Sequence, residues 1–179
     1  MKPKNSVFIA TSLDGYITDK NGGIDWLHSI PNPENDDMGY ASFIDTIDAL
    51  VMGRKTFETI CSFNIPWPYE KPVFILSTTL TTLPHDYTDK AFLIKGAIPE
   101  VLKTIHQQGH QRLYIDGGST INNFLKKDFI DEMIITTLPI LLGGGTRLFG
   151  NLPNLLEFEL VGSKTYLNEV PQTHYRRNR

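Results

Sequence analysis

Short apolar runs along the chain alternate with segments in which apolar residues recur every three or four positions. The runs predict buried strands at residues 6–12, 49–53, 72–77, 91–95, 112–116 and 132–138. Helical spacing between them predicts helices at residues 35–47, 55–61, 98–108 and 119–127. In the first of these helices, Met38, Ala41, Ile44 and Ile47 follow one another at three-residue intervals. This alternation is typical of an α/β sheet with helices on its faces.

The last part of the chain has a different period. Residues 156–161, 165–167 and 173–177 alternate between apolar and polar, as antiparallel strands do. The expected fold class is therefore α/β with a mixed sheet, largely parallel at first and antiparallel at the end. A single domain over residues 1–179 is expected, since no repeat or linker interrupts the chain. A loop at residues 13–33 is rich in Gly, Asp, Asn and Pro, and loops of that length tend to be functional.

Composition narrows the class of protein. Hydrophobic residues make up 40% and charged residues 21% of the chain, as in soluble globular proteins. The net charge of −3 provides no broad basic surface, so nucleic acid is not an expected partner. No apolar run is long enough for a membrane span or a signal peptide, and the single Cys61 fits a reducing compartment, so a cytoplasmic location is expected. One cysteine and scattered histidines lack zinc-binding spacing, so no metal is expected.

Two of the predicted strands end in glycine and turn at once into a helix. Gly53 precedes Arg54, Lys55 and Thr56, and the pair Gly117-Gly118 precedes Ser119-Thr120. Ligands of open α/β sheets bind outside the carboxyl ends of the strands, and free N–H groups at a helix start attract phosphate. Each turn alone is equally an ordinary strand-to-helix connection. The two together, with the Arg-Lys pair, indicate a nucleotide site, although a G-x-G-x-x-G fingerprint after the first strand is absent.

These turns resemble those of a known superfamily. Residues 52–58, 75–78 and 116–119 resemble, in the same order, the adenine-nucleotide turn, the following strand end and the pyrophosphate turn of dihydrofolate reductase. Residues 12–17, 25–27 and 138–149 are similar to the reductase domain of bacterial riboflavin biosynthesis. The chain is therefore identified as a stand-alone member of the dihydrofolate-reductase-like group, in the riboflavin reductase branch.

The resemblance implies an eight-stranded sheet with NADPH across its carboxyl edge, and it also favours a homodimer. It implies that Arg54, Ser77 and Thr78 hold the 2′-phosphate with Lys55 nearby, that Thr56 and residues 117–120 hold the pyrophosphate, and that Ala10 and Ile17 flank the nicotinamide. The full set of expected cofactor positions is Ala10, Ile17, Gly53, Arg54, Lys55, Thr56, Ser77, Thr78, Gly117, Gly118, Ser119 and Thr120. The loop containing residues 143–145, otherwise a flexible Gly-rich connection, then lies near the ligand.

Hydride transfer to a C=N bond or an opened sugar carbonyl also needs a proton. Asp37 is the candidate acid, because it lies sixteen positions before Gly53, the spacing of the acidic residue in dihydrofolate reductases. Asp37 is equally well explained as favourable charge at a helix start. Asp14 is a second polar candidate for the substrate pocket, or else forms a turn with Gly15.

Trp26 and Tyr40 either line the substrate pocket or belong to the core. Lys71 stands where a folate-binding arginine is expected, and the loop between Trp26 and Asp37 is longer than expected, which argues against folate. The expected function is therefore NADPH-dependent reduction of a pterin-like or ribosylamino-pyrimidine-like substrate, of the 5-amino-6-(5-phosphoribosylamino)uracil reductase type. The alternatives are dihydrofolate reductase activity and a nucleotide-binding module without catalysis.

Overall fold

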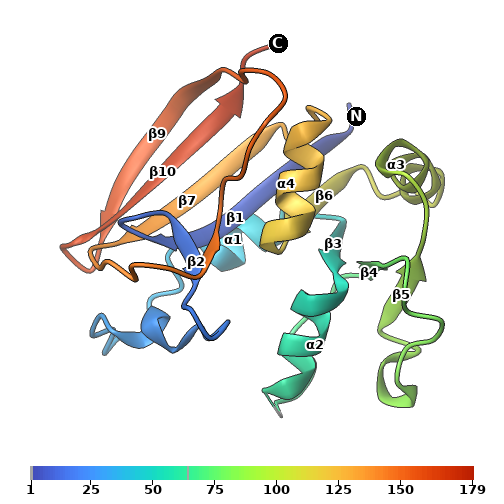
Figure 1. Ribbon diagram of the computed structural model, residues 1–179, viewed down its shortest axis with the longest axis horizontal. Helices are drawn as coiled ribbons and strands as arrows, with labels where there is room; N and C mark the ends of the chain where they lie inside the picture. The colour runs from blue at the N-terminus through green and yellow to red at the C-terminus, as the bar shows by residue number, and fades with distance from the viewer. Residues whose placement is uncertain (1, 64) are drawn as a thin grey trace.

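The computed structural model describes residues 2–63 and 65–179, and eight of its strands form one sheet (Figure 1). The order across the sheet is β5-β4-β3-β6-β1-β7-β10-β9. Neighbouring strands from β5 to β7 are parallel, whereas β10 is antiparallel to both β7 and β9. The mixed, mostly parallel class predicted from the sequence is confirmed. The strands are β1 (Lys4–Ser12), β3 (Ala49–Gly53), β4 (Val73–Leu76), β5 (Ala91–Ile94), β6 (Arg112–Asp116), β7 (Glu132–Leu138), β9 (Phe158–Tyr166) and β10 (Val170–Arg177).

Helices cover both faces of the parallel part of the sheet because side chains of a strand alternate between its faces. Val51 packs with the apolar residues of α3 (Ile98–Gln107) and α4 (Gly118–Lys126). Its neighbours Leu50 and Met52 pack with α1 (Tyr40–Ile44) and α2 (Arg54–Ser62) on the opposite face. Both faces of β3 are therefore buried, which explains why its sequence is an uninterrupted apolar run.

The first predicted helix is much shorter than its periodicity indicates. Residues 35–47 were expected to be helical, but α1 spans only Tyr40–Ile44. Asn35, Met38 and Gly39 have φ values of 51°, 54° and 86°, which a right-handed helix does not allow. Local side chains stabilise this turn, since Asp36 Oδ1 accepts a hydrogen bond from the Met38 amide at 2.7 Å. Short-range hydrogen bonding by aspartate thus competes successfully with helix formation.

Two other regions also differ from expectation. The loop at residues 13–33 contains a short strand, β2 (Tyr16–Thr18), paired antiparallel with β8 (Thr146–Arg147), and a 3₁₀ turn, η1 (Asp25–His28). A second 3₁₀ turn, η2 (His85–Tyr87), precedes β5. The three C-terminal segments expected from the sequence form only two strands, β9 and β10. Residues 162–164 do not interrupt β9, because they lie on this solvent-exposed edge strand and continue its pairing with β10.

The carboxyl ends of β4, β3, β6, β1 and β7 lie in that order along one edge of the sheet. The two Gly-containing turns start from β3 and β6, which are neighbours in the sheet. Parallel pairing thus brings together segments more than sixty residues apart in the chain. Within the described ranges, no helix combines the length and the apolar character needed to cross a membrane.

Candidate active site

The turns after β3 and β6 pack directly against each other. A Cβ atom added to Gly53 would lie 2.8 Å from Thr120 Oγ1, and one added to Gly117 would overlap Thr56 Oγ1. Gly117 also has a φ of +88°, a conformation that favours glycine. Each turn therefore contributes a glycine that faces the threonine of the other. The starts of α2 and α4 lie side by side as a result, with their free N–H groups at the same edge of the sheet.

Arg54 and Lys55 add positive charge beside these helix starts, and both side chains are exposed. Arg54 Nη1 donates a hydrogen bond to Thr79 Oγ1 at 3.3 Å, and its Nε lies 3.5 Å from Glu58 Oε1. Ser77 is buried, and its Oγ accepts hydrogen bonds from the amides of residues 79 and 80. Thr78 is exposed. The structure therefore adds Thr79, which the sequence interpretation omitted, to the hydroxyl groups beside Arg54.

The predicted nicotinamide neighbours lie on the other side of β6. Ala10 is half-buried on β1, and Ile17 is half-buried on β2. A Cβ atom on Gly118 would approach Ile17 Cδ1 to 2.7 Å and Thr146 Cγ2 to 3.2 Å. The strand pair β2–β8 therefore packs closely on the first residue of α4. Of the other residues in this turn, Thr120 is buried and Ser119 is exposed.

Asp14 connects the first loop to the triple-glycine loop. Its Oδ1 accepts hydrogen bonds from Ser12 Oγ at 2.6 Å and from the Leu142 amide at 3.1 Å, and its Oδ2 accepts one from the Gly143 amide at 2.8 Å. The Ser12 hydroxyl and these amides hold the pKa of the Asp14 carboxyl below its usual value. An ionised carboxylate that accepts three hydrogen bonds is suited to fixing this loop. The expected turn with Gly15 is also present, since the Gly15 amide donates to the Ser12 carbonyl at 2.9 Å.

Asp37 is an exposed acceptor at the approach to α1. Its Oδ2 accepts a hydrogen bond from the Ala41 amide at 2.8 Å, and its Oδ1 accepts one from the Gly39 amide at 2.8 Å. These two bonds lower the pKa of the Asp37 carboxyl. A carboxylate of lowered pKa is ionised at neutral pH and is a poor proton donor. The geometry thus favours a local structural role, one of the two interpretations that the sequence left open for Asp37.

Asp116 has the opposite electrostatic character, and sequence reasoning treated it only as part of the phosphate turn. It ends β6, between β3 and β1, and is half-buried. Burial raises the pKa of its carboxyl to about 6, although the Gly117 amide donates to Oδ1 at 2.8 Å. Burial, together with the nearby Asp116 charge, also raises the pKa of Tyr40 to about 12. A carboxyl with this pKa at the centre of the edge can hold a proton near neutral pH.

The two aromatic candidates have different surroundings. The Tyr40 ring lies edge-on to Phe8, with ring centroids 5.6 Å apart, and to Tyr114 at 6.5 Å. Trp26 belongs to an apolar cluster with Ala10 and Met38, and its Nε1 is buried without a hydrogen-bond partner among residues 2–63 and 65–179. Tyr40 is close enough to Asp116 for that charge to raise its pKa, whereas Trp26, itself part of the first loop, packs in the apolar cluster around Leu138, Tyr166 and Val170. A polar residue that ends a buried strand run just before a glycine pair is the sequence signal that identifies Asp116.

Comparison with known proteins assigns this fold to a family. The RibD C-terminal domain family matches residues 3–171. A crystal structure from Shewanella sp. PV-4, of a protein named for riboflavin biosynthesis, superposes with a TM-score of 0.96 at 53% identity, over 98% of this chain and 99% of that one.

More distant structures share the fold. A Thermotoga maritima diaminohydroxyphosphoribosylaminopyrimidine deaminase/5-amino-6-(5-phosphoribosylamino)uracil reductase aligns with a TM-score of 0.76 at 14% identity, over 99% of this chain and 57% of that one. A dihydrofolate reductase from Enterococcus faecalis, complexed with NADP(H), aligns with a TM-score of 0.67 at 15% identity, over 98% and 97% of the two chains. The predicted dihydrofolate-reductase-like fold is confirmed by these likenesses.

Proposed function

This chain belongs to the RibD C-terminal domain family, and we propose that it is an NADPH-dependent reductase with its active site at the carboxyl edge of the sheet. The family and its structural neighbours include reductases, which supports an oxidoreductase. The substrate that we propose is a ribosylamino-pyrimidine or a pterin-like heterocycle.

The observation that carries the proposal is the mutual packing of the two glycine turns. Gly53 and Gly117 have no room for a Cβ atom because the threonine of the opposite turn lies against each of them, and this close packing brings the starts of α2 and α4 together at the edge. Backbone N–H groups at two adjacent helix starts fit a pyrophosphate, and Arg54, Lys55 and Thr79 fit a 2′-phosphate. When bound, NADPH supplies the hydride. Ala10 and Ile17 are the residues proposed to border its nicotinamide ring.

We assign the proton to Asp116 in place of Asp37. Hydride addition to a C=N or C=O bond places negative charge on the nitrogen or oxygen, and the Asp116 carboxyl would donate its proton to that atom as the charge develops. Its raised pKa keeps a useful fraction protonated near pH 6. Tyr40, whose pKa is raised to about 12, stays protonated throughout this range and can donate a hydrogen bond to the substrate.

The test is a measurement of NADPH oxidation with 5-amino-6-(5-phosphoribosylamino)uracil as acceptor and with dihydrofolate in parallel. Loss of a general acid typically costs 10²–10⁴-fold in rate, so we expect Asp116→Asn to lower kcat by about that factor. Asp37→Asn is the matched control and should retain most of the activity. Turnover of dihydrofolate alone would favour the dihydrofolate reductase alternative. Binding of NADPH without oxidation of it by either acceptor would favour the non-catalytic module.

The cofactor assignment has its own test, which is fluorescence titration with NADPH and NADH. We expect NADPH to bind more tightly, and Arg54→Ala to reduce that preference by about tenfold, because a charged hydrogen bond to the 2′-phosphate is lost. An unchanged preference would place the 2′-phosphate elsewhere. Comparison of Thr78→Ala with Thr79→Ala then shows which hydroxyl binds the 2′-phosphate. The sequence predicts that of Thr78, whereas Arg54 contacts that of Thr79.

We also propose that the protein forms a homodimer, in which β9 pairs with its copy. This strand is the edge of the sheet and exposes Leu160 and Val161. Antiparallel pairing about a two-fold axis between Val161 and Gly162 would set Glu159 of one copy opposite Lys164 of the other. Sedimentation equilibrium tests this, with Leu160→Lys expected to give monomers. The cytoplasmic location stays a prediction.

A further inference from the structure

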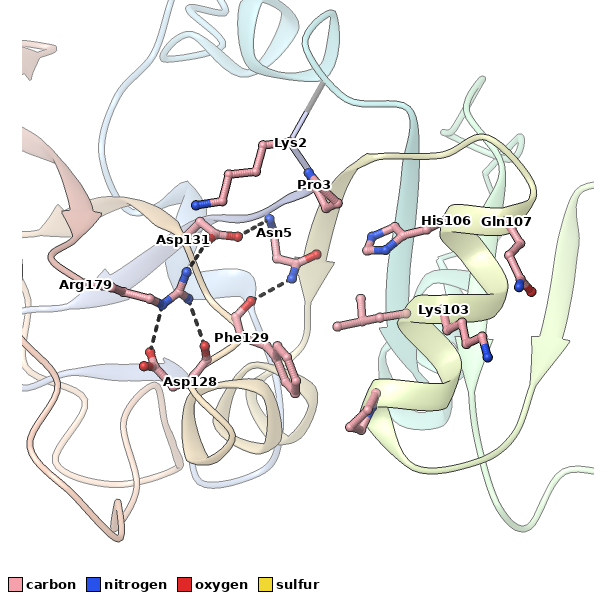
Figure 2. Close-up of a pocket in the computed structure, with 12 residues that line it drawn as sticks. Lys2, Pro3, Asn5, Lys103, His106, Gln107, Asp128, Phe129, Asp131 and Arg179 are labelled. Carbon is pink, nitrogen blue, oxygen red and sulfur yellow. Dashed lines mark hydrogen bonds and ion pairs between the residues drawn. The ribbon is translucent and has the colours of Figure 1, made fainter.

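Carboxylates at the two edges of the sheet are paired to different degrees. A hollow of about 750 Å³ lies at the amino edge, and there Asp128 and Asp131 form ion pairs with Arg179, at 3.5 Å and 2.6 Å (Figure 2). Asp116, at the carboxyl edge, has no ion pair with residues 2–63 or 65–179 and accepts a hydrogen bond from the Gly117 amide at 2.8 Å. The uncharged side chains around Asp116 therefore determine what a ligand meets beside this carboxyl.

Tyr69 lies near Asp116, as Tyr40 does. Both rings pack against the apolar cluster that contains Tyr114, on the face of the sheet that α1 and α2 cover. Met52 belongs to that cluster and is the partner of Asp116 in the pairing of β3 with β6, so Asp116 is on the same face. Burial, and after it the negative charge of Asp116, raises the pKa of Tyr69, and the same two causes raise that of Tyr40. Two phenol groups are therefore close to the carboxyl of Asp116.

The hydroxyl groups of these tyrosines differ in whether the protein itself uses them. Tyr114 is buried, and its Oη donates a hydrogen bond to the Phe8 carbonyl at 2.8 Å. Tyr40 and Tyr69 are half-buried, and neither hydroxyl forms a hydrogen bond within the described part of the chain. Neither Oη is among the fully buried polar atoms that lack a partner there, so both hydroxyl groups are accessible. Each has a proton that it can donate to a ligand.

Aromatic neighbours fix the ring of Tyr69. It lies edge-on to Trp67, with ring centroids 5.3 Å apart, and Trp67 packs in turn against Phe57 of α2 at 6.1 Å and against Tyr87 at 5.3 Å. A side chain that is already held in place loses little conformational entropy when its hydroxyl binds a ligand. The segment between α2 and β4, in which Lys71 replaces the expected folate-binding arginine, thus offers a preorganised neutral donor.

We propose that Tyr69 is a substrate-binding residue, whose hydroxyl donates a hydrogen bond, together with that of Tyr40, to a ring carbonyl oxygen of the heterocycle. This assignment rests on the proposed reductase function. A carbonyl oxygen has two lone pairs and can accept from both phenols. Because neither phenol ionises near neutral pH, both remain donors while Asp116 exchanges its proton.

Steady-state oxidation of NADPH with 5-amino-6-(5-phosphoribosylamino)uracil and with dihydrofolate tests the assignment. A hydrogen bond made equally in the ground state and the transition state contributes to KM and leaves kcat unchanged. We expect Tyr69→Phe to raise KM for the heterocycle by about fivefold, and to leave kcat and the Kd of NADPH within about twofold of the parent. Tyr87→Phe is the matched control, because its ring belongs to the same aromatic group while its hydroxyl lies beside Cys61, and it should leave KM unchanged.

A ¹³C NMR titration of protein labelled at tyrosine Cζ tests the placement of the hydroxyl without substrate or turnover. The signals of Tyr69 and Tyr40, assigned by their loss in the Tyr→Phe variants, should shift with a midpoint near pH 6 as Asp116 ionises. Asp116→Asn should abolish this shift and leave the pH dependence of the Tyr87 signal as in the parent.

Three results would overturn the assignment of Tyr69 alone. These are an unchanged KM in Tyr69→Phe when the parent reduces a heterocycle, an equal rise of KM in Tyr69→Phe and Tyr87→Phe, and a Tyr69 signal that does not follow the ionisation of Asp116. A parent protein that binds NADPH and reduces neither heterocycle would instead overturn the proposed function, and the substrate role of Tyr69 with it. The Cζ titration separates these cases, since it reports the position of the hydroxyl in either one.

Discussion

The raised pKa of Asp116 predicts that the residue proposed as the acid also destabilises the protein at neutral pH. In the folded chain burial raises this pKa to about 6, whereas the ordinary value is 3.8. Below pH 3.8 the carboxyl is protonated in both the folded and the unfolded chain, so its burial does not lower the free energy of unfolding. As the pH rises through 6 the folded state has to hold a charge in a poorly hydrated place, so the free energy of unfolding falls.

The interval between 3.8 and about 6 corresponds to roughly 3 kcal/mol. Asp116 as a residue is only half-buried, so we expect about 1–3 kcal/mol. Asp116→Asn removes the charge and keeps an oxygen that can accept from the Gly117 amide. The variant should therefore be more stable than the parent at pH 7.5 by about that amount, with a much smaller difference at pH 4.5.

Urea denaturation of both proteins at the two pH values measures this effect. Asp45→Asn is the control, since Asp45 is an exposed aspartate at the end of α1, and it should leave the pH dependence as in the parent. An Asp116→Asn variant that is no more stable than the parent at pH 7.5, or equally stabilised at pH 4.5, would refute the reasoning. A stabilised variant that has lost reductase activity would show that function and stability oppose each other at this position.

The other predictions concern the turns and loops. Gly117→Ala forces a Cβ atom onto Thr56 Oγ1 at a φ of +88°, and we expect a loss of about 3 kcal/mol in urea denaturation. Thr56→Ala should recover part of this loss in the double variant, because it removes the clashing oxygen, whereas Thr56→Ser retains that oxygen and should recover less. Asp14→Ala removes the acceptor of the Leu142 and Gly143 amides, so hydrogen exchange at those two amides should accelerate while exchange in β3 is unchanged. Asp37→Asn should lower the melting temperature at pH 7, because the lowered pKa of Asp37 stabilises the folded chain when the carboxyl is ionised. The difference should shrink as the pH falls below 3.8 and vanish once the pH is below the lowered pKa of the folded chain; a difference that does not shrink below pH 3.8 would contradict this.

The parallel part of the fold was predictable from the sequence because burial on both faces leaves a simple signal. The strands 112–116 and 132–138 have the predicted bounds, since each begins at the charged residue that precedes its apolar run, Arg112 or Glu132. The helix before β3 was not predictable by the same means. Apolar spacing continued through Met38, but Asn35, Met38 and Gly39 adopt left-handed conformations, and the side chain of Asp36 stabilises this turn with a hydrogen bond. Periodicity reports which side chains are buried and carries no information on such local bonds.

The turns of the candidate site were predictable from the sequence, because they depend on backbone conformation. The protonation of its carboxyl groups was less predictable, because it depends on their surroundings. Glycine after a strand signals a turn that needs free backbone, and Gly53 and Gly117 do occur in turns that contact each other. The protonation of a carboxyl depends on what surrounds it in three dimensions. The sequence places Asp116 at the end of a strand and Asp37 near the start of a helix, but it does not show that the surroundings lower the pKa of Asp37 and raise that of Asp116.

The hydrogen bonds of Asp14 join two loops that are far apart in the sequence, so that the loops move as one unit. β2 pairs with β8, Asp14 holds residues 142 and 143, and the Leu148 amide donates to the Gly15 carbonyl at 2.9 Å. Neither loop can therefore swing outward alone without breaking hydrogen bonds to the other. Any movement that uncovers Gly118 therefore has to displace both loops together, so the two loops behave as one flap that is attached to the sheet at two places. An insertion in either loop would alter the motion of both.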